Sequence, residues 1–248
     1  MMKNKNKSKP AAILFDADKM LLSDNLPFSI KEAYKTLRTN VMFSLPGNES
    51  KCLGVVSADR GDGKSSISIN LAISLAQIGK RVIIVDCDLR LPTISSKLGI
   101  EEKTGLSNFL SGNIEDQNEL IKRSDKYGID VITSGDIPPD PTTLLGSEQM
   151  GNCIKLLKEY YDYIILDFPP ITIVSDAVIL SNNVDGYLIV VRHYSSEYKK
   201  IAETVRQMKF ASAKILGVVY NGKSNHRKYY KRSSKYYKTG YYKEYYKK

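Results

Sequence analysis

Apolar runs of strand length alternate with longer amphipathic segments through most of the chain. The apolar runs predict strands at Leu53–Ser57, Arg81–Val85, Asp130–Thr133, Tyr163–Leu166, Gly186–Val191 and Ile215–Val219. The amphipathic segments predict helices at Ser29–Phe43, Lys64–Gln77, Ser147–Tyr160, Ser175–Asn183 and Ser196–Phe210. Several strands are apolar nearly throughout, as in a parallel sheet that helices cover on both faces. The order of elements therefore predicts a doubly wound α/β domain with a mostly parallel sheet over residues 45–222, preceded by an N-terminal segment, 1–44.

The excess of positive charge lies at the C-terminal end. The 248 residues include 37 Lys+Arg and 27 Asp+Glu, a net charge of +10. Residues 223–248 hold 10 basic residues and a single acid, Glu244, and so carry +9, whereas residues 1–222 carry only +1. A near-neutral body argues against a protein that coats nucleic acid over its whole surface. The basic tail has no apolar period and is expected to be disordered until bound.

Three features bear on the compartment. No run of about 18 apolar residues is present, so no transmembrane helix is predicted. The basic stretch Met1–Pro10 is followed by only a short apolar patch, Ala11–Phe15, which does not make a secretory leader. Cys52, Cys87 and Cys153 form no CxxC pair, which argues against a disulfide framework or a zinc site. These features predict a cytoplasmic protein with reduced cysteines.

A glycine-rich motif connects the strand that ends at Ser57 to the helix that begins at Lys64. Its sequence is Gly61-Asp62-Gly63-Lys64-Ser65-Ser66. In such a motif backbone N–H groups close on phosphate oxygens, the lysine reaches the β- and γ-phosphates, and the first serine can ligate Mg²⁺. The motif therefore predicts a site for ATP and Mg²⁺. Ala58 stands where the standard spacing has its first glycine, and a plain glycine turn before a helix is the alternative.

Two further strands end in carboxylates. Asp86 and Asp88 follow the apolar run Val82–Val85, and Asp167 follows Tyr163–Leu166. The carboxyl ends of parallel strands border the ligand crevice, and strand alternation predicts that Asp86 and Asp88 point to the same side. Asp167 has the position of a Walker B aspartate, which holds Mg²⁺ directly or through water. For Asp86 and Asp88, a solvated turn at the strand end is the alternative.

These motifs, together with a tyrosine-rich tail, resemble the bacterial tyrosine kinases, the cytoplasmic kinase subunits of capsular and exopolysaccharide synthesis systems. The resemblance covers nearly the whole chain and is carried by Gly61–Ser65, Asp86–Thr93, Tyr160–Pro170 and the tail. It implies a P-loop NTPase fold of the deviant Walker group. It also likens Asn221, at the end of the last strand, to the family's asparagine near the nucleotide base, although a turn asparagine is equally compatible with the pattern.

The resemblance assigns roles to the site residues. Asp86 would act as the base on the tyrosine hydroxyl, Asp88 would help to position Mg²⁺, and Asp167 would be the Walker B ligand. Catalysis would then depend on Lys64, Asp86, Asp88 and Asp167. The metal would be held by Ser65, Asp88 and Asp167.

Paired tyrosines fill the tail. They are Tyr229, Tyr230, Tyr236, Tyr237, Tyr241, Tyr242, Tyr245 and Tyr246. Such a segment cannot form a core, and it resembles the family's autophosphorylation cluster, which is modified in trans. A basic, aromatic tail that binds anionic surfaces, nucleic acid included, is the alternative.

Charged residues recur at intervals of three on the predicted helix Ser29–Phe43. Glu32, Lys35 and Arg38 resemble the family's Glu-x-x-Arg-x-x-Arg oligomerisation motif, and the resemblance implies a homo-oligomer that forms a ring. Lys35 replaces the first arginine of that motif and cannot make its bidentate fork with a carboxylate. A solvated charged face is the alternative.

As a whole the resemblance implies an ATP- and Mg²⁺-dependent protein tyrosine kinase that regulates polysaccharide synthesis and export. A transmembrane activator would recruit it to the inner face of the membrane, a cognate tyrosine phosphatase would reverse its action, and no specific nucleic acid is implied. The rival is a partition or positioning ATPase of the same deviant Walker group, and a tail-driven binding protein is a third possibility. The partition and positioning ATPases carry a signature lysine five residues before the P-loop lysine. This chain has Asp59 at that position, which argues against the rival.

Overall fold

The computed structural model describes residues 21–23, 25–101, 104–114, 117–193 and 195–222. The tail with its eight tyrosines and the basic N-terminus lie outside these residues. The strands are β1 (Lys51–Ser57), β2 (Val82–Asp86), β3 (Lys122–Ser124), β4 (Ile129–Ile132), β5 (Tyr163–Asp167), β6 (Gly186–Arg192) and β7 (Ile215–Asn221). The helices are α1 (Phe28–Ser44), α2 (Lys64–Ala76), α3 (Ile94–Leu98), α4 (Leu106–Leu110), α5 (Gln117–Leu120), α6 (Pro141–Leu145), α7 (Glu148–Tyr160), α8 (Asp176–Ile179) and α9 (Tyr198–Phe210), with a 3₁₀ turn, η2, at Ser181–Asn183.

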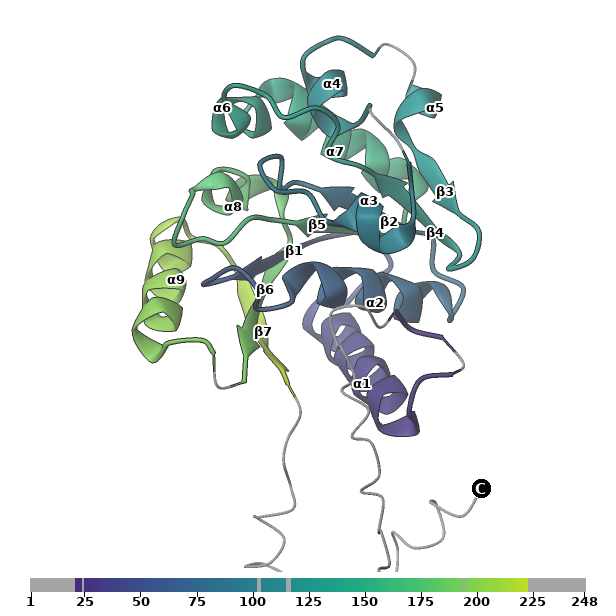
Figure 1. Ribbon diagram of the computed structural model, residues 1–248, viewed down its shortest axis with the longest axis vertical. Coiled ribbons are helices and arrows are strands. Elements are labelled where there is room, and N and C mark those ends of the chain that lie inside the picture. The colour runs from purple at the N-terminus through teal and green to yellow at the C-terminus, as the bar shows by residue number, and fades with distance from the viewer. Residues whose placement is uncertain (1–20, 24, 102–103, 115–116, 194, 223–248) are drawn as a thin grey trace, which may run out of the picture.

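A single sheet organises the described residues, in the order β3-β4-β2-β5-β1-β6-β7. Its neighbouring strands are parallel except for β3, which runs antiparallel to β4. Helices α1 and α2 lie on one side of the sheet, and α4, α6 and α7 lie on the other (Figure 1). The predicted doubly wound, mostly parallel sheet is confirmed. Within the described residues, every helix is too short or too polar to cross a membrane.

The centre of the sheet is fully buried because helices cover both of its faces. Every residue of β1 is buried, as are all residues of β2 and β5. A Cβ atom at Gly54 would lie 2.3 Å from the ring of Tyr187, so only glycine fits at this point of β1. The hydroxyl of Tyr187 donates to the carbonyl oxygen of Ala177 at 2.7 Å. A tightly packed centre of this kind fixes the ends of β1, β2 and β5, from which the site is built.

The expected strands and helices occur, with two differences. The edge strand β3 and the short helices α3 to α6 are additional, since β3 has three polar residues and a helix of four or five residues makes little more than one turn. The expected helix Ser175–Asn183 is divided into α8 and η2. Its second half, Ser181–Asn183, consists of serine and asparagine, whose side chains compete for backbone hydrogen bonds and disfavour an α-helix.

Candidate active site

The glycine-rich motif forms the loop between β1 and α2 (Figure 1). Gly61 and Gly63 have φ angles of +78° and +89°, in the left-handed region that glycine adopts without strain. Gly63 is the N-cap of α2, and no side chain caps this helix. The positive end of the α2 helix dipole therefore lies at this loop, where it favours an anion such as phosphate.

Lys64 lies at the centre of the site. Its Nζ atom is 3.3 Å from Oδ2 of Asp88, and both side chains are nearly buried. Burial acts to lower the pKa of Lys64, but the negative charges of Asp167, Asp88 and Asp86 outweigh it, and the pKa is raised. Lys64 therefore stays charged, and the structure brings it together with all three predicted aspartates.

Asp86 and Asp167 end the neighbouring strands β2 and β5 and are partners in the strand register. Both are fully buried. Burial, followed by the negative charge of Asp167, raises the pKa of Asp86 to about 8. Burial also raises the pKa of Asp167, although the charge of Lys64 and the hydroxyl of Ser65 oppose the rise. Two buried carboxylates side by side repel each other, so this position favours either a shared proton or a cation.

Backbone N–H groups surround the Asp86 carboxylate. Oδ1 accepts from Asp88 at 3.2 Å, and Oδ2 accepts from Thr93 and Ile94 at 3.3 and 3.1 Å. The N–H of Leu91 donates to Oδ1 of Asp88 at 3.1 Å. The prediction that Asp86 and Asp88 alternate along one strand was wrong, because β2 ends at Asp86 and a turn positions Asp88. Asp86 holds that turn, residues 87–93, in place.

The Asp167 carboxylate has one oxygen to offer a metal. Its Oδ1 accepts from the hydroxyl of Ser68 at 3.0 Å, while Oδ2 is buried and has no hydrogen-bond partner in the described part of the chain. A buried carboxylate oxygen of this kind, with the Ser65 hydroxyl nearby, suits Mg²⁺, which prefers oxygen ligands. No group of three His, Cys, Asp or Glu side chains among the described residues could hold a metal alone. The donors fit a Mg²⁺ ion that is shared with nucleotide phosphates and water.

Residues just before and at the start of α9 contact the P-loop. Ser196 Oγ donates to Oδ1 of Asp62 at 2.8 Å, and Lys200 Nζ pairs with Oδ2 of Asp59 at 2.9 Å. Oδ2 of Asp62 also accepts the Asp59 N–H at 3.1 Å. Sequence reasoning missed Ser196 and Lys200, since no motif marks them and only the pairing of β6 with β1 brings this segment beside the P-loop.

Two further contacts reach P-loop carbonyl groups. Nδ2 of Asn221 donates to the carbonyl oxygen of Asp62 at 2.9 Å. A guanidinium N–H of Arg192 donates to the carbonyl oxygen of Gly61. Asn221, expected near the nucleotide base, thus lies at the P-loop and supports its backbone.

A second network, which sequence reasoning also missed, anchors the turn after β2. The guanidinium of Arg90 pairs with the fully buried carboxylate of Asp176 in α8 and donates to Thr142 Oγ1 in α6 at 2.8 Å. Thr142 Oγ1 donates in turn to Oδ1 of Asp176 at 2.8 Å. Arg90 lies two residues after Asp88, so the network ties the position of that carboxylate to two helices.

The three residues likened to an oligomerisation motif make different contacts. Lys35 Nζ pairs with Oε1 of Glu32 at 2.8 Å on the exposed side of α1. Arg38 instead donates to the carbonyl oxygen of Ser74 in α2 at 2.7 Å. Residues at i, i+3 and i+6 spread over about 120° of a helix surface, which allows this division. Glu32 and Lys35 lie on an open face, whereas Arg38 holds α1 to α2.

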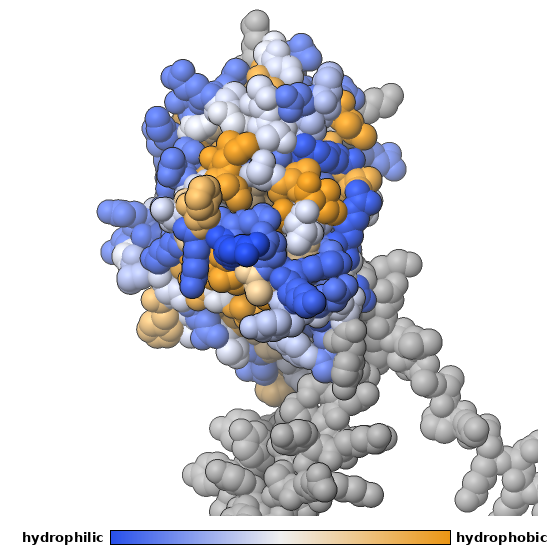
Figure 2. Space-filling model, turned by 90° about the vertical axis from the view of Figure 1, so that its left-hand side faces the viewer, coloured by the Kyte–Doolittle hydropathy of each residue, from blue (hydrophilic) through white to orange (hydrophobic). Residues whose placement is uncertain are grey.

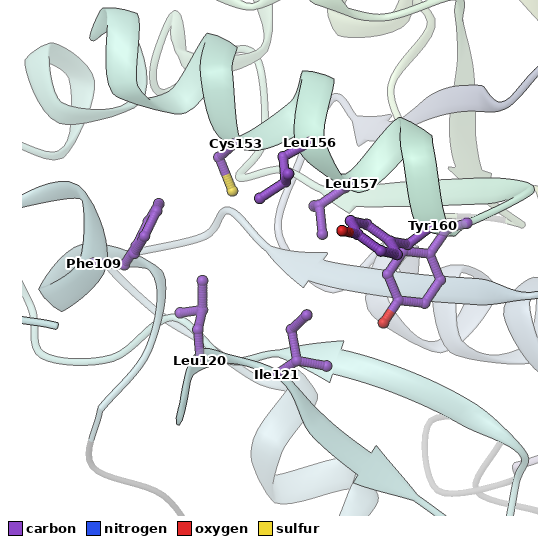
Figure 3. A pocket seen from close by; sticks show the side chains of 8 residues that line it. Phe109, Leu120, Ile121, Cys153, Leu156, Leu157 and Tyr160 are labelled. Carbon is purple, nitrogen blue, oxygen red and sulfur yellow. The ribbon is translucent and has the colours of Figure 1, made fainter. Parts of the chain in front are cut away.

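Hydrophobic patches border a hydrophilic centre on the side of the molecule where α9 lies (Figure 2). Leu91, Ile137 and Ile173 are exposed in the loops after β2, β4 and β5. A separate apolar groove of about 280 Å³ lies between α4 and α7, where Phe109 and Cys153 face each other (Figure 3). None of the predicted site residues lines this groove, so it is distinct from the phosphate site.

The fold and the P-loop define a P-loop NTPase of the ParA group. The ParA family model, described as the NUBPL iron-transfer P-loop NTPase, matches residues 48–248, and the chain belongs to that family. The septum site-determining protein MinD from Pyrococcus horikoshii, solved with Mg-ADP, has a TM-score of 0.60 and 23% identity over 71% of this chain and 72% of that one. At that identity the likeness to MinD is one of fold alone.

Within this class the relatives are kinases. The chain is 36% identical over 200 residues to tyrosine-protein kinase YwqD of Bacillus subtilis (strain 168), which covers 80% of this chain and 84% of the relative. The solved kinase domain of the Escherichia coli tyrosine kinase ETK has a TM-score of 0.75 and 31% identity over 82% of this chain and 83% of that one. The chain therefore belongs to the bacterial tyrosine-protein kinases, and the resemblance noted from the motifs is confirmed.

Proposed function

We propose that this kinase transfers the γ-phosphoryl group of ATP to tyrosine hydroxyls in the C-terminal cluster of a neighbouring copy. The observation that carries the proposal is the placement of buried Asp86 and Asp167 in register beside the Lys64 ammonium. A tyrosine hydroxyl has a pKa of about 10, and its attack is helped by a carboxylate that takes the proton. Asp86 suits that task because its pKa is raised to about 8.

The other residues would bind and orient the nucleotide. The backbone of Gly61–Ser66 would hold the phosphates, and Lys64 would stabilise negative charge on the transferred group. Ser65, Asp88 and Asp167 would hold Mg²⁺, which when bound neutralises charge on the β- and γ-phosphate oxygens. The turn that positions Asp88 is fixed through Asp86 and Arg90, so these side chains would keep their arrangement as the phosphates enter.

The acceptor tyrosines Tyr229–Tyr246 lie outside the described residues, and their use rests on the family and on reach. The 26 residues from Lys223 onward can span an adjacent copy at up to about 3.3–3.6 Å per residue. Modification of all eight tyrosines would turn a tail charge of +9 into about −3 to −7. That reversal would weaken any contact that holds the basic tail in an acidic site.

The partners are proposals of the same kind. They are a transmembrane activator of the polysaccharide co-polymerase type, which would recruit the chain to the cytoplasmic face of the membrane, a cognate phosphatase, and further copies of this chain. The family supports them, since its members act in capsular and exopolysaccharide systems. The rival positioning ATPase is disfavoured because Asp59, which stands at its signature lysine, is paired with Lys200 inside the same chain.

The test is to incubate the purified full chain with Mg-ATP, with and without activator segments, and to locate phosphotyrosine by mass spectrometry. Tail phosphotyrosine that is absent from a Lys64→Met variant supports the proposal. ATP hydrolysis without phosphotyrosine under all of these conditions would contradict it and favour the ATPase.

A further inference from the structure

Tyr198 is the first residue of α9 and the most exposed tyrosine that the structure describes. Its relative exposure is 83%, against 59% for Tyr160 and 56% for Tyr220. Helix α9 lies at the left edge of the molecule in Figure 1 and faces the viewer in Figure 2. The phenol is therefore open to a second protein molecule.

The sequence around Tyr198 is repeated in the tail. Residues 195–200 read Ser-Ser-Glu-Tyr-Lys-Lys, and residues 233–238 read Ser-Ser-Lys-Tyr-Tyr-Lys. Both contain the pattern Ser-Ser-x-Tyr-x-Lys, so Tyr198 and Tyr236 share this local sequence pattern. Neither Tyr160 nor Tyr220 has this pattern. A site that accepts the tail around Tyr236 meets most of the same side chains around Tyr198.

The neighbours of Tyr198 in the chain touch the P-loop. Ser196, two residues before it, donates to Asp62 at 2.8 Å, and Lys200, two residues after it, pairs with Asp59 at 2.9 Å. Lys200 also lies 3.4 Å from Oε1 of Glu197. A charge added at Tyr198 therefore enters the segment that supports the phosphate loop.

The local charges can accommodate a phosphate at this position. Tyr198 lies at the N-terminal end of α9, a helix of 13 residues, where the helix dipole favours negative charge. Lys199 and Lys200 add positive charge, and Glu197 is the acidic side chain next to it in sequence. The carboxylates of Asp59 and Asp62, on the P-loop side, would repel the added phosphate charge. The added phosphate would in turn repel the phosphates of the nucleotide.

We propose that Tyr198 is a further phosphoacceptor of this kinase, modified by a second copy of the chain, and that its phosphate weakens nucleotide binding. The proposal rests on the proposed function. In the transfer, the Tyr198 Oη atom forms a bond to the γ-phosphorus of ATP, and the bond from that phosphorus to the β–γ bridging oxygen breaks. ADP leaves with the electron pair, and the phenol proton passes to the carboxylate base of the second copy.

The first experiment maps phosphate after incubation with Mg-ATP and activator. It uses the full chain and a variant in which all eight tail tyrosines are Phe. Because trypsin leaves Tyr194 and Tyr198 on one peptide, His193–Lys199, fragment ions must assign the phosphate. Phosphate on Tyr198 in both proteins, and its loss in the Tyr198→Phe variant of the second, supports the proposal.

Other distributions of phosphate overturn it. The proposal for Tyr198 is contradicted by tail phosphorylation without phosphate on Tyr198. It is also contradicted by phosphate on Tyr194 instead, or by equal labelling of the exposed controls Tyr160 and Tyr220. In the first of these cases the proposed function survives. Absence of phosphotyrosine everywhere refutes both.

The second experiment tests transfer between copies. An isotope-labelled Lys64→Met chain, which cannot act for itself, is mixed with unlabelled active protein. Phosphate on Tyr198 of the labelled chain is expected. Phosphate on Tyr198 of the unlabelled chains alone, with the labelled tail modified, would show transfer within one copy and contradict the proposal.

The third measurement concerns the effect of the modification. The variant without tail tyrosines and its Tyr198→Phe derivative are treated with Mg-ATP, freed of nucleotide, and titrated with Mg-ADP. The protein phosphorylated on Tyr198 is expected to bind about 3-fold more weakly or worse at low salt, with a smaller difference at high salt because ions screen the added charge. Equal affinities would overturn the regulatory part of the proposal.

Discussion

The ammonium group of Lys64 lies 3.3 Å from Oδ2 of Asp88, and this nearly buried pair joins the first residue of α2 to the turn after β2. The phosphates of a nucleotide would compete with Asp88 for the same positive charge. Loss of one partner from a buried pair typically costs about 3–5 kcal/mol, because the remaining charge is left uncompensated. Lys64 is therefore expected to contribute to stability as well as to phosphoryl transfer.

Lys64→Met is expected to reduce phosphotyrosine formation by about 100-fold or more, since it removes the positive charge that would face the transferred phosphoryl group. The same change should lower the free energy of unfolding, because Asp86, Asp88 and Asp167 lose the charge that compensates them. Quantitative mass spectrometry and urea denaturation measure the two effects.

A double variant separates the effect of Lys64→Met on phosphorylation from its effect on stability. Adding Asp88→Asn to Lys64→Met removes one uncompensated carboxylate and should recover part of the lost stability without restoring phosphorylation. Normal phosphorylation by the single Lys64→Met variant would show that this loop is not the catalytic one.

The three carboxylates are expected to differ when each is changed to its amide. Asp86→Asn should block phosphorylation but weaken Mg-ADP binding less than the other two changes, because the residue serves as base and reaches the metal site only through the turn that carries Asp88. Asp88→Asn and Asp167→Asn should weaken Mg²⁺-dependent binding by about 10-fold. Calorimetric titrations with ADP at several Mg²⁺ concentrations make the comparison, and an equal loss of affinity in all three would contradict the separate role of Asp86.

Stability should depend on pH through the raised pKa of Asp86. The pKa in the folded protein is about 8, above the ordinary value of 3.8, so the folded state binds more protons between these values. The contribution to stability is therefore fully present below the unfolded pKa and is lost as pH rises toward 8, by at most about 1.4 kcal/mol per pH unit for one proton. Urea denaturation from pH 5 to pH 8.5, without nucleotide, should show this decline.

Matched variants test whether Asp86 is the group that causes the decline of stability with pH. Asp86→Asn should flatten the decline, whereas Asp125→Asn, at a fully exposed carboxylate, should leave it unchanged. If Asp86→Asn and the unaltered chain declined in parallel, another residue would be responsible.

The long elements were predictable from the sequence because burial imposes a period on them. The runs at β1, β5 and β6 are apolar on both faces, and α2 and α7 show helical spacing, so their positions agree within a few residues. The strand β3 could not be foreseen, since Lys122–Ser124 is short, polar and at the edge of the sheet. A sequence pattern detects burial, and this strand has little.

The residues of the site likewise divide into those that the sequence predicts and those that only the fold reveals. Lys64, Asp86 and Asp167 could be predicted from the sequence because each directly ends a strand or begins a helix at the ligand edge of the sheet. Ser196 and Lys200 lie more than 130 residues from the loop that they hold, and only the sheet order brings them there. Arg38 was misleading for a related reason: its spacing with Glu32 gives no hint that α2 lies beneath it.

Changes on α1 should separate packing from assembly. Arg38→Ala removes the bond to the carbonyl oxygen of Ser74 near the C-terminal end of α2, where a cation is favoured, and is expected to lower stability by about 1 kcal/mol. Lys35→Ala removes only the exposed pair with Glu32, so stability should change by less than about 0.5 kcal/mol. If the open face of α1 contacts another copy, Lys35→Ala should nevertheless reduce the mass of assemblies formed with activator. Thermal unfolding and light scattering of both variants test this, and loss of assembly in Arg38→Ala with unchanged stability would mean that Arg38, not Lys35, faces the neighbouring copy.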